Sequence, residues 1–378
     1  MTPYILYGAY ASYYTAKSRA YLRKKGIPFE ERLPSDPQFR ELVRPKSGTP
    51  KIPQMLTPDS EVIQDTVEIV DYLEPRFQSL PAFPATPKQR VFAHLMELLA
   101  SEGLLHLAWL HRWLHEDNYF FVEMDFGRSF SPQGSDAELM KYGQVISNRM
   151  KTGGLLPEAT PEMLARIHQQ VVTLLELLEQ HFRRHPYLLG GQPCVADYAM
   201  MGALHAHMGR DPVPLRIMQD HAPRVFRWVE HMQVPEIAAP EFFDTEIAFL
   251  ADDAVPDTAV ALLNHIADTH GAPFLRDALA FAHYVERDKP ASGQGFDETN
   301  IDQELKVTGV DIDGEKQDVT VQLHLIWILQ RSQIYFQQLA ENVRHEVLDG
   351  LGEGVAARLL QVPAKAALQR RNYRLYIS

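Results

Sequence analysis

The sequence predicts a small α/β domain followed by a longer, mostly helical region. Near the start of the chain, short apolar runs flank a helix-like pattern, which indicates a β-α-β opening. Four prolines then fall between residues 75 and 87, which is typical of a linker between domains. Beyond this linker, apolar residues recur at steps of three and four over long segments, so we expect helices there.

The opening domain is expected to alternate short strands and helices. Gly26 and Pro28 should end the first helix, because glycine suits a helix C-terminus and proline cannot continue one. Two further prolines, Pro50 and Pro53, suit the turn or edge entry to a strand better than a central strand. The expected order is strand 4–8, helix 15–25, strand 29–33, a helical stretch 37–43, the proline segment 48–56, strand 61–63 and helix 65–73.

The rest of the chain divides into two further regions. Helical periodicity predicts helices at 89–113, 163–182 and 195–208, and beyond Leu250 at 258–270, 273–287 and 323–347. Between the last two, alternating residues on either side of a turn at 311–314 predict a β-hairpin. We therefore expect three domains: 1–78, 86–245, and an extension at 250–378 that packs on the rest because its helices carry apolar faces.

Composition excludes several classes of function. The single cysteine, Cys194, excludes an internal disulfide and any zinc site built on several thiolates, and it fits a reducing compartment. A net charge of -12 opposes binding to phosphate backbones, so we expect no nucleic-acid partner. The start of the chain lacks a signal-peptide pattern, and no run of about 18 apolar residues follows. These features predict a cytoplasmic protein without a membrane partner.

Several coupled elements of the first domain resemble the N-terminal domain of the glutathione S-transferase family. Ile52-Pro53 matches the family's cis-proline position, and Gln64-Asp65-Thr66 matches its acidic and hydroxyl step. The strand and loop at 6–12 and the helix body around Lys17-Ser18-Arg19 fit the same pattern, over roughly residues 3–76. The resemblance implies an α/β thioredoxin-like domain, followed by an all-α glutathione-transferase-type domain and a mostly α extension with a β-hairpin.

The resemblance also implies how each element would hold glutathione. Ser12 would donate its hydroxyl to the thiol at the positive end of the first helix. Ile52, turned by a cis Pro53, would pair with the cysteinyl backbone. Asp65 would pair with the γ-glutamyl ammonium, and Thr66 would hold the adjacent carboxylate. Candidates for the glycyl carboxylate are Lys51 and Lys46.

Two features depart from the family pattern. Tyrosines surround the serine, and some classes of the family use a phenol, so Tyr7, Tyr10 and Tyr13 remain alternatives to Ser12. In the helical region, the run from Gly190 to Asp197 is similar to the family's glycine, cap and Ala-Asp signature, but Cys194 stands where a Ser or Thr is usual. Asp197 can still bond back to the cap amide.

The resemblance implies a glutathione S-transferase that uses glutathione as co-substrate against a small hydrophobic electrophile and forms a homodimer. Alternatives are a glutathione-dependent isomerase, reductase or peroxidase, or a non-catalytic scaffold module, because the fold fixes the thiol and not the acceptor. His111 and His115 lie one helical turn apart, as metal ligands can, but no HExxH pattern accompanies them. We therefore expect these histidines to pack, and we expect no metal.

Overall fold

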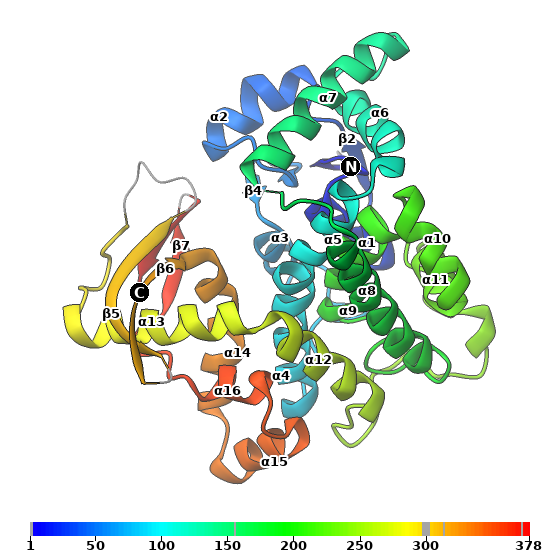
Figure 1. Ribbon diagram of the computed structural model, residues 1–378. Coiled ribbons are helices and arrows are strands. Elements are labelled where there is room, and N and C mark those ends of the chain that lie inside the picture. Colours follow the sequence, from blue (N-terminus) through cyan, green and yellow to red (C-terminus); the bar gives the residue numbers. More distant parts are fainter. Residues whose placement is uncertain (1–2, 155, 297–302, 313, 372) are drawn as a thin grey trace. The chain divides into compact units, whose positions relative to one another are not determined.

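The computed structural model describes residues 3–154, 156–296, 303–312, 314–371 and 373–378 (Figure 1). Contacts divide the chain into two compact units, and each unit is made of two stretches. Unit 1 comprises Met1–Ala82 and Leu104–Leu250, and unit 2 comprises Phe83–Gly103 and Ala251–Ser378. Asp313 of the predicted hairpin turn lies outside the described residues.

Unit 1 begins with a four-stranded mixed sheet in the order β2-β1-β3-β4. Its strands are Tyr4–Tyr7 (β1), Phe29–Arg32 (β2), Gln54–Leu56 (β3) and Val62–Gln64 (β4). Strand β1 pairs parallel with β2 and antiparallel with β3, which pairs antiparallel with β4. In the register, Tyr7 lies opposite Gln54, and Gln54 lies opposite Gln64. The end of β1, the start of β3 and the end of β4 therefore share one edge of the sheet.

The helices of the first domain follow the predicted order. Lys25 and Gly26 end the first helix, and Gly26 takes a φ of 63°, the left-handed conformation that glycine favours at this position. This helix packs against α3 and against two later helical segments, Val195–Met201 (α9) and Gly202–Met208 (η4). The helices are Tyr13–Lys24 (α1), a π-helical segment Phe39–Val43 (η1) continued by Arg44–Ser47 (α2), and Thr66–Leu73 (α3).

The remainder of unit 1 is helical, as predicted, and contains more helices than the periodicity indicated. Helices α6 and α7 pack so closely that a Cβ added at Gly127 or Gly143 would lie 1.9 Å from a backbone oxygen of the other helix. The segments are Leu104–Trp113 (α5), Glu116–Asn118 (η3), Tyr119–Phe130 (α6), Asp136–Gly153 (α7), Pro161–Phe182 (α8), Val195–Met201 (α9), Gly202–Met208 (η4), Pro212–His221 (α10), Pro223–His231 (α11) and Pro240–Phe242 (η5).

Unit 2 is built around a helix from early in the chain. Helices α12, α14 and α15 pack against α4. The predicted hairpin is confirmed as β5 and β6, and a second hairpin near the C-terminus, β7 and β8, was not predicted. The elements are Pro87–Leu98 (α4), Leu99–Gly103 (η2), Asp257–His270 (α12), Ala272–Asp288 (α13), Glu304–Ile312 (β5), Glu315–Gln322 (β6), Leu323–Gln338 (α14), Glu341–Leu351 (α15), Val355–Gln361 (α16), Leu368–Arg371 (β7) and Arg374–Ile377 (β8).

One predicted helix is wrong in length. The pattern at 323–347 predicted a single helix, but the chain is extended at Leu339, with ψ of 152°, and α15 begins at Glu341. No proline or glycine marks this break, and the two helices on either side of it, α14 and α15, each pack against α4.

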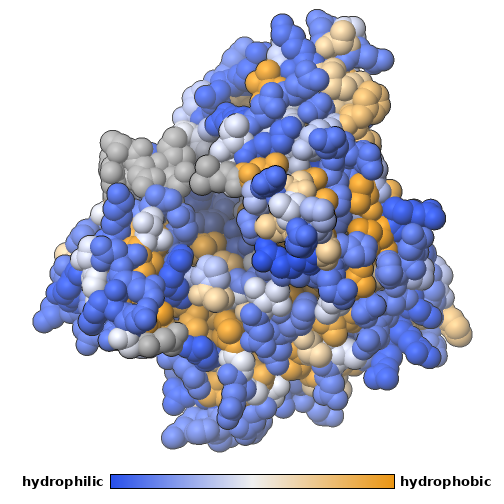
Figure 2. Space-filling view, viewed as in Figure 1, coloured by the Kyte–Doolittle hydropathy of each residue, from blue (hydrophilic) through white to orange (hydrophobic). Residues whose placement is uncertain are grey.

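By length and composition, one helix within the described ranges, Pro87–Trp113, could span a membrane, with a mean hydropathy of 1.2 over its most apolar window. That window is 83% buried inside the structure, which is the environment of a core helix. A single helix of this kind is weak evidence for a membrane. Figure 2 shows a surface that is mainly hydrophilic, with hydrophobic residues in smaller areas.

Candidate active site

The loop that follows β1 is held close to the first helix. The Gly8 amide donates to the Arg32 carbonyl at 2.9 Å, and the Ser12 amide donates to the Ala9 carbonyl at 3.1 Å. A Cβ at Gly8 would lie 2.2 Å from Cγ2 of Thr15, so only glycine lets the loop approach the helix this closely. The loop therefore delivers Ser12 directly to the start of α1.

Ser12 is the N-cap of α1, and its side chain is half-buried. Its Oγ accepts a hydrogen bond from the Thr15 amide at 3.3 Å. As an acceptor in this bond, the hydroxyl keeps its own proton for donation to a ligand. The hydroxyl lies at the positive end of the helix dipole, where a thiolate is favoured. The predicted position at the helix start is confirmed, while its catalytic role stays a prediction.

The three alternative tyrosines differ in their burial and in their contacts. Tyr7 is fully buried and donates to Oε1 of Gln38 at 2.6 Å, and burial raises the pKa of its phenol. A phenol with a raised pKa is a weaker acid for thiol activation. Tyr13 is buried, and its ring lies 5.4 Å from the ring of His207.

Tyr10 is the exposed member of the group, with 43% of its surface accessible. Its ring lies under the Arg19 guanidinium at 4.0 Å, and its hydroxyl accepts from Nη2 of Arg23 at 3.2 Å. Arg23 stands 11 residues beyond Ser12, about 16 Å along the axis of α1. The Tyr10 phenol thus extends away from the helix start, which leaves Ser12 as the candidate hydroxyl at that position.

The proline loop meets the same edge of the sheet. The Ile52-Pro53 bond is cis, as the resemblance implied. The loop is braced by Gln54, a fully buried side chain whose Nε2 donates to the carbonyls of Thr49 and Lys51 at 2.8 and 2.9 Å. Gln54 was not identified from the sequence, because an isolated glutamine at the start of a strand carries no pattern.

Asp65 and Thr66 lie where β4 ends and α3 begins. Asp65 has a φ of 91°, which is costly for a residue other than glycine. Its Oδ1 accepts from the Val67 amide at 2.8 Å, so it caps α3, and Thr66 is buried as the first residue of the helix. Backbone strain of this kind concentrates at ligand-binding positions.

Both candidate lysines are exposed and precede β3: Lys46 lies in α2, and Lys51 lies on the loop between α2 and β3. The Lys51 amide donates to Oγ1 of Thr49 at 3.2 Å, and Nζ of Lys46 donates to the Ser60 carbonyl at 2.9 Å. The Ser12 loop, the Pro53 loop and the Asp65 cap therefore meet at one sheet edge, because the register aligns Tyr7, Gln54 and Gln64. Lys51 lies on the Pro53 loop, three residues before Gln54, and Lys46 lies in the preceding helix α2.

The second signature also forms the expected local structure. Asp197 accepts from the amides of Cys194 and Leu188, each at 2.9 Å, and from the Cys194 thiol at 3.2 Å. Complete burial raises the pKa of the Cys194 thiol well above its usual value and raises the pKa of Asp197 to about 6. Cys194 is therefore a structural residue and is unsuited to act as a nucleophile.

The histidine pair packs in the helical part of unit 1. The rings of His111 and His115 have centroids 4.6 Å apart, and burial lowers the pKa of His111 to about 3. The ring is therefore neutral at physiological pH. Among the residues that the structure describes, no group of three or more His, Cys, Asp or Glu side chains could hold a metal ion.

A cavity of about 450 Å³ lies in the helical part of unit 1. Its walls come from residues 113–119 and 156–164 and include Trp113, Tyr119, Leu156 and Leu164. Trp113 directly follows Arg112, whose guanidinium donates to the carbonyl of Ala11 at 3.0 Å. Trp113, which lines the cavity, is therefore next in sequence to Arg112, which contacts the Ser12 loop. The walls also include His115, Glu116 and Asp117, so apolar, aromatic and charged side chains together line this cavity.

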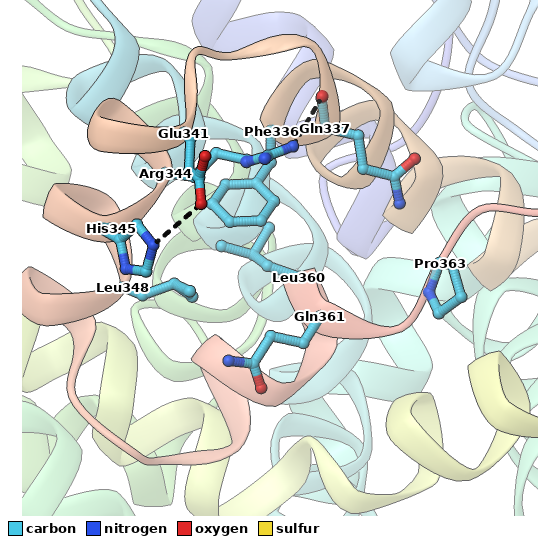
Figure 3. A pocket seen from close by; sticks show the side chains of 9 residues that line it. All are labelled: Phe336, Gln337, Glu341, Arg344, His345, Leu348, Leu360, Gln361 and Pro363. Atoms are coloured by element: carbon cyan, nitrogen blue, oxygen red, sulfur yellow. Dashed lines mark hydrogen bonds and ion pairs between the residues drawn. The ribbon is translucent and has the colours of Figure 1, made fainter.

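A second cavity, of about 380 Å³, belongs to unit 2 and contains none of the predicted site residues. Figure 3 shows Phe336, Leu348 and Leu360 beside the polar side chains of Glu341 and His345. The last two lie 3.9 Å apart and are both exposed. This cavity carries no arrangement of groups that suggests chemistry.

Family models match two stretches of the chain. Residues 6–81 match the N-terminal domain of glutathione S-transferases, and residues 161–231 match the C-terminal domain of the same family. The first stretch contains the Ser12 loop, the cis-proline and the Asp65 cap, and the second contains the Asp197 cap. Comparison with curated proteins gives no match.

Solved structures with similarity to this chain include three that cover about two thirds of it. A glutathione S-transferase from Methylobacterium radiotolerans in complex with glutathione sulfonate is 20% identical and covers 68% of this chain and 100% of its own, with a TM-score of 0.37. A beta-etherase from Sphingobium sp. strain SYK-6 is 18% identical and covers 64% of this chain and 98% of its own, with a TM-score of 0.44. A glutathione transferase from Phanerochaete chrysosporium is 15% identical and covers 63% of this chain and 99% of its own, with a TM-score of 0.45. In residues 6–81 and 161–231, the chain carries the N-terminal and C-terminal domains of the glutathione S-transferase family.

Proposed function

We propose that the protein is a glutathione transferase-like enzyme that activates the glutathione thiol for attack on a hydrophobic electrophile. The observation that supports this proposal is the register that aligns Tyr7, Gln54 and Gln64. It brings a helix-start hydroxyl, a cis-proline loop and a strained acidic cap to one edge of the sheet. These are the three kinds of group that a γ-glutamyl tripeptide thiol needs.

Each group has a chemical task in the proposed reaction. The γ-glutamyl ammonium pairs with Asp65, and the neighbouring carboxylate accepts from the amide and hydroxyl of Thr66 at the start of α3. The cysteinyl backbone lies along Ile52, and Lys51 or Lys46 attracts the glycyl carboxylate. The thiol releases its proton to solvent, and Ser12 donates a hydrogen bond to the sulfur, which stabilises the thiolate.

The thiolate then attacks the electrophilic carbon of the acceptor, a carbon–sulfur bond forms, and the leaving group departs with the electron pair of the broken bond. The cavity lined by Trp113 and Tyr119 is the proposed place for the acceptor. Binding to immobilised glutathione, together with turnover of 1-chloro-2,4-dinitrobenzene, tests the proposal. A protein that shows neither would instead be a scaffold module.

Asp65→Asn is expected to weaken glutathione binding by about 1 to 3 kcal/mol, because it removes the charge that pairs with the ammonium. Asparagine tolerates a positive φ and can still accept from the Val67 amide, so the cap is retained. Titration calorimetry measures the loss.

Asp59→Asn serves as the control for this substitution, because Asp59 is an exposed acid in the turn between β3 and β4. It should bind glutathione like the parent protein. Unchanged affinity in Asp65→Asn would contradict the placement of the γ-glutamyl end.

We also propose that the protein is a cytoplasmic homodimer, as the resemblance implies. Helices α6 and α7 carry large apolar side chains at the surface, among them Phe120, which is 72% exposed, and Tyr142, which is 47% exposed. Such side chains suit a protein–protein contact. Light scattering coupled to size exclusion should give the mass of two chains, and the mass of one chain would contradict the dimer.

A further inference from the structure

A buried arginine joins the loop that carries Ser12 to the helical part of unit 1. From the end of α5, Arg112 donates through Nη1 to the Ala11 carbonyl at 3.0 Å and through Nη2 to the Ala206 carbonyl at 2.5 Å. Its guanidinium also binds Asp211, with Nε–Oδ2 and Nη2–Oδ1 distances of 2.7 and 3.0 Å. Arg112 is 2% exposed and Asp211 is 1% exposed.

Stability alone is a weak reason for such a pair. Removing two charges from water costs free energy that their attraction often fails to recover, so buried ion pairs are seldom net stabilising. They can instead fix one arrangement of the groups around them. Here the group that is fixed is the Ala11 carbonyl, which belongs to the peptide unit that ends at the nitrogen of Ser12.

The other hydrogen bonds of this loop do not perform the same task. The Gly8 amide ties the beginning of the loop to Arg32 of β2, and the Ser12 amide closes a turn within the loop by donating to Ala9. The bond from Arg112 acts at the end of the loop and comes from a different part of the unit. It therefore sets where the loop ends relative to η4 and Asp211.

We propose that Arg112 is a positioning residue that holds the Ser12 hydroxyl in place for the glutathione sulfur. This inference rests on the proposed function. Asp211 balances the guanidinium charge, so the effect on the sulfur comes from geometry and is transmitted through the Ala11–Ser12 peptide unit. A positioning error of about 1 Å can cost up to about a hundredfold in rate, so the contribution is measurable.

Two substitutions test the proposal. Arg112→Met removes every donor but keeps an apolar chain, and Arg112→Lys keeps the charge and one donor group while losing the planar fork. In Arg112→Met we expect the pKa of bound glutathione to rise by about one pH unit. We expect kcat with 1-chloro-2,4-dinitrobenzene to fall about tenfold while the Kd of glutathione stays unchanged. Arg112→Lys should recover part of both losses.

Lys25→Met provides a matched control. The ammonium of Lys25 is buried, pairs at 2.9 Å with Glu74, whose side chain is 15% exposed, and donates to the Ser79 carbonyl at 2.7 Å. Its loss therefore also breaks an ion pair in unit 1. No bond of Lys25 reaches the Ser12 loop. The control should lose stability and keep the parent thiol pKa.

Hydrogen exchange in the absence of glutathione gives a readout that does not depend on activity. The Ser12 amide should exchange faster in both Arg112 variants and at the parent rate in Lys25→Met. The inference is overturned if both Arg112 variants keep the parent thiol pKa and exchange rate, whatever their melting temperatures. A parent protein that neither binds glutathione nor turns over the electrophile refutes the proposed function, and the catalytic part of this inference with it.

Discussion

Replacing Ser12 with alanine is expected to lower turnover about a hundredfold. This is the usual cost of removing one preorganised hydrogen-bond donor that stabilises an anion in an active site. The substitution removes the hydroxyl that lies at the start of α1. The pKa of bound glutathione should rise, so less thiolate is present at neutral pH. Affinity for glutathione should remain near that of the parent, because the contacts proposed for Asp65, Thr66 and Ile52 are untouched. Thiolate absorbance against pH measures the shift.

Tyrosine variants decide whether the serine carries this role. Tyr10→Phe removes the exposed phenol, and Tyr7→Phe removes the phenol that donates to Gln38. Tyr13→Phe tests the third alternative. All three should keep the parent thiol pKa. If Ser12→Ala leaves the thiol pKa unchanged and one of the tyrosine variants raises it, the assignment to Ser12 is wrong.

Ending the chain at Leu250 is expected to abolish cooperative folding of residues 83–103. The apolar side chains of α4 are buried in the full chain, and helices α12, α14 and α15 pack against this helix. Leu95, Met96 and Leu98 are each 0% exposed. Re-exposing a large apolar side chain costs about 1.5 to 3 kcal/mol, and several such losses approach the 5 to 15 kcal/mol that stabilise a typical domain. Size exclusion and thermal unfolding of the truncated chain measure the effect.

A protease site inserted between Leu250 and Ala251 separates the effect of cutting the chain from the effect of losing the partner elements. The cut protein retains every element that packs around α4, so its two pieces should elute together and melt close to the intact chain. A soluble fragment 1–250 that melts as the intact chain does would contradict the expectation that residues 251–378 pack on the earlier part of the chain.

The elements that the sequence predicts well are those whose signals are local. Gly26 ends α1 because the left-handed conformation is cheap for glycine. The cis geometry at Pro53 is implied by the family resemblance, since a proline alone does not predict a cis bond. The position of Ser12 at a helix start likewise follows from the apolar run before it and the helical spacing after it. Such features depend on a few neighbouring residues.

The rest depends on contacts between residues far apart in the sequence. From the sequence alone, Arg112 is an ordinary polar residue of an amphipathic helix. Only the fold brings Ala11, 101 residues earlier, to its guanidinium. No helix-breaking residue stands at the break at Leu339, and the helices on both sides of it pack on α4. Sequence patterns also cannot divide the helical run Pro87–Trp113 between two units, since contacts with segments far away in the chain decide which half belongs to which unit.

This division of the helix has a consequence during synthesis. Helix α4 leaves the ribosome early, but Gln338, at the end of one of the helices that cover it, follows Leu98 by about 240 residues. At about 5 to 20 residues per second, α4 waits roughly 10 to 50 s for these partners. During that interval its apolar side chains are available to chaperones and to neighbouring nascent chains. The yield of soluble protein should therefore respond to translation speed and chaperone supply more strongly than the yield of a chain in which each domain is one continuous stretch.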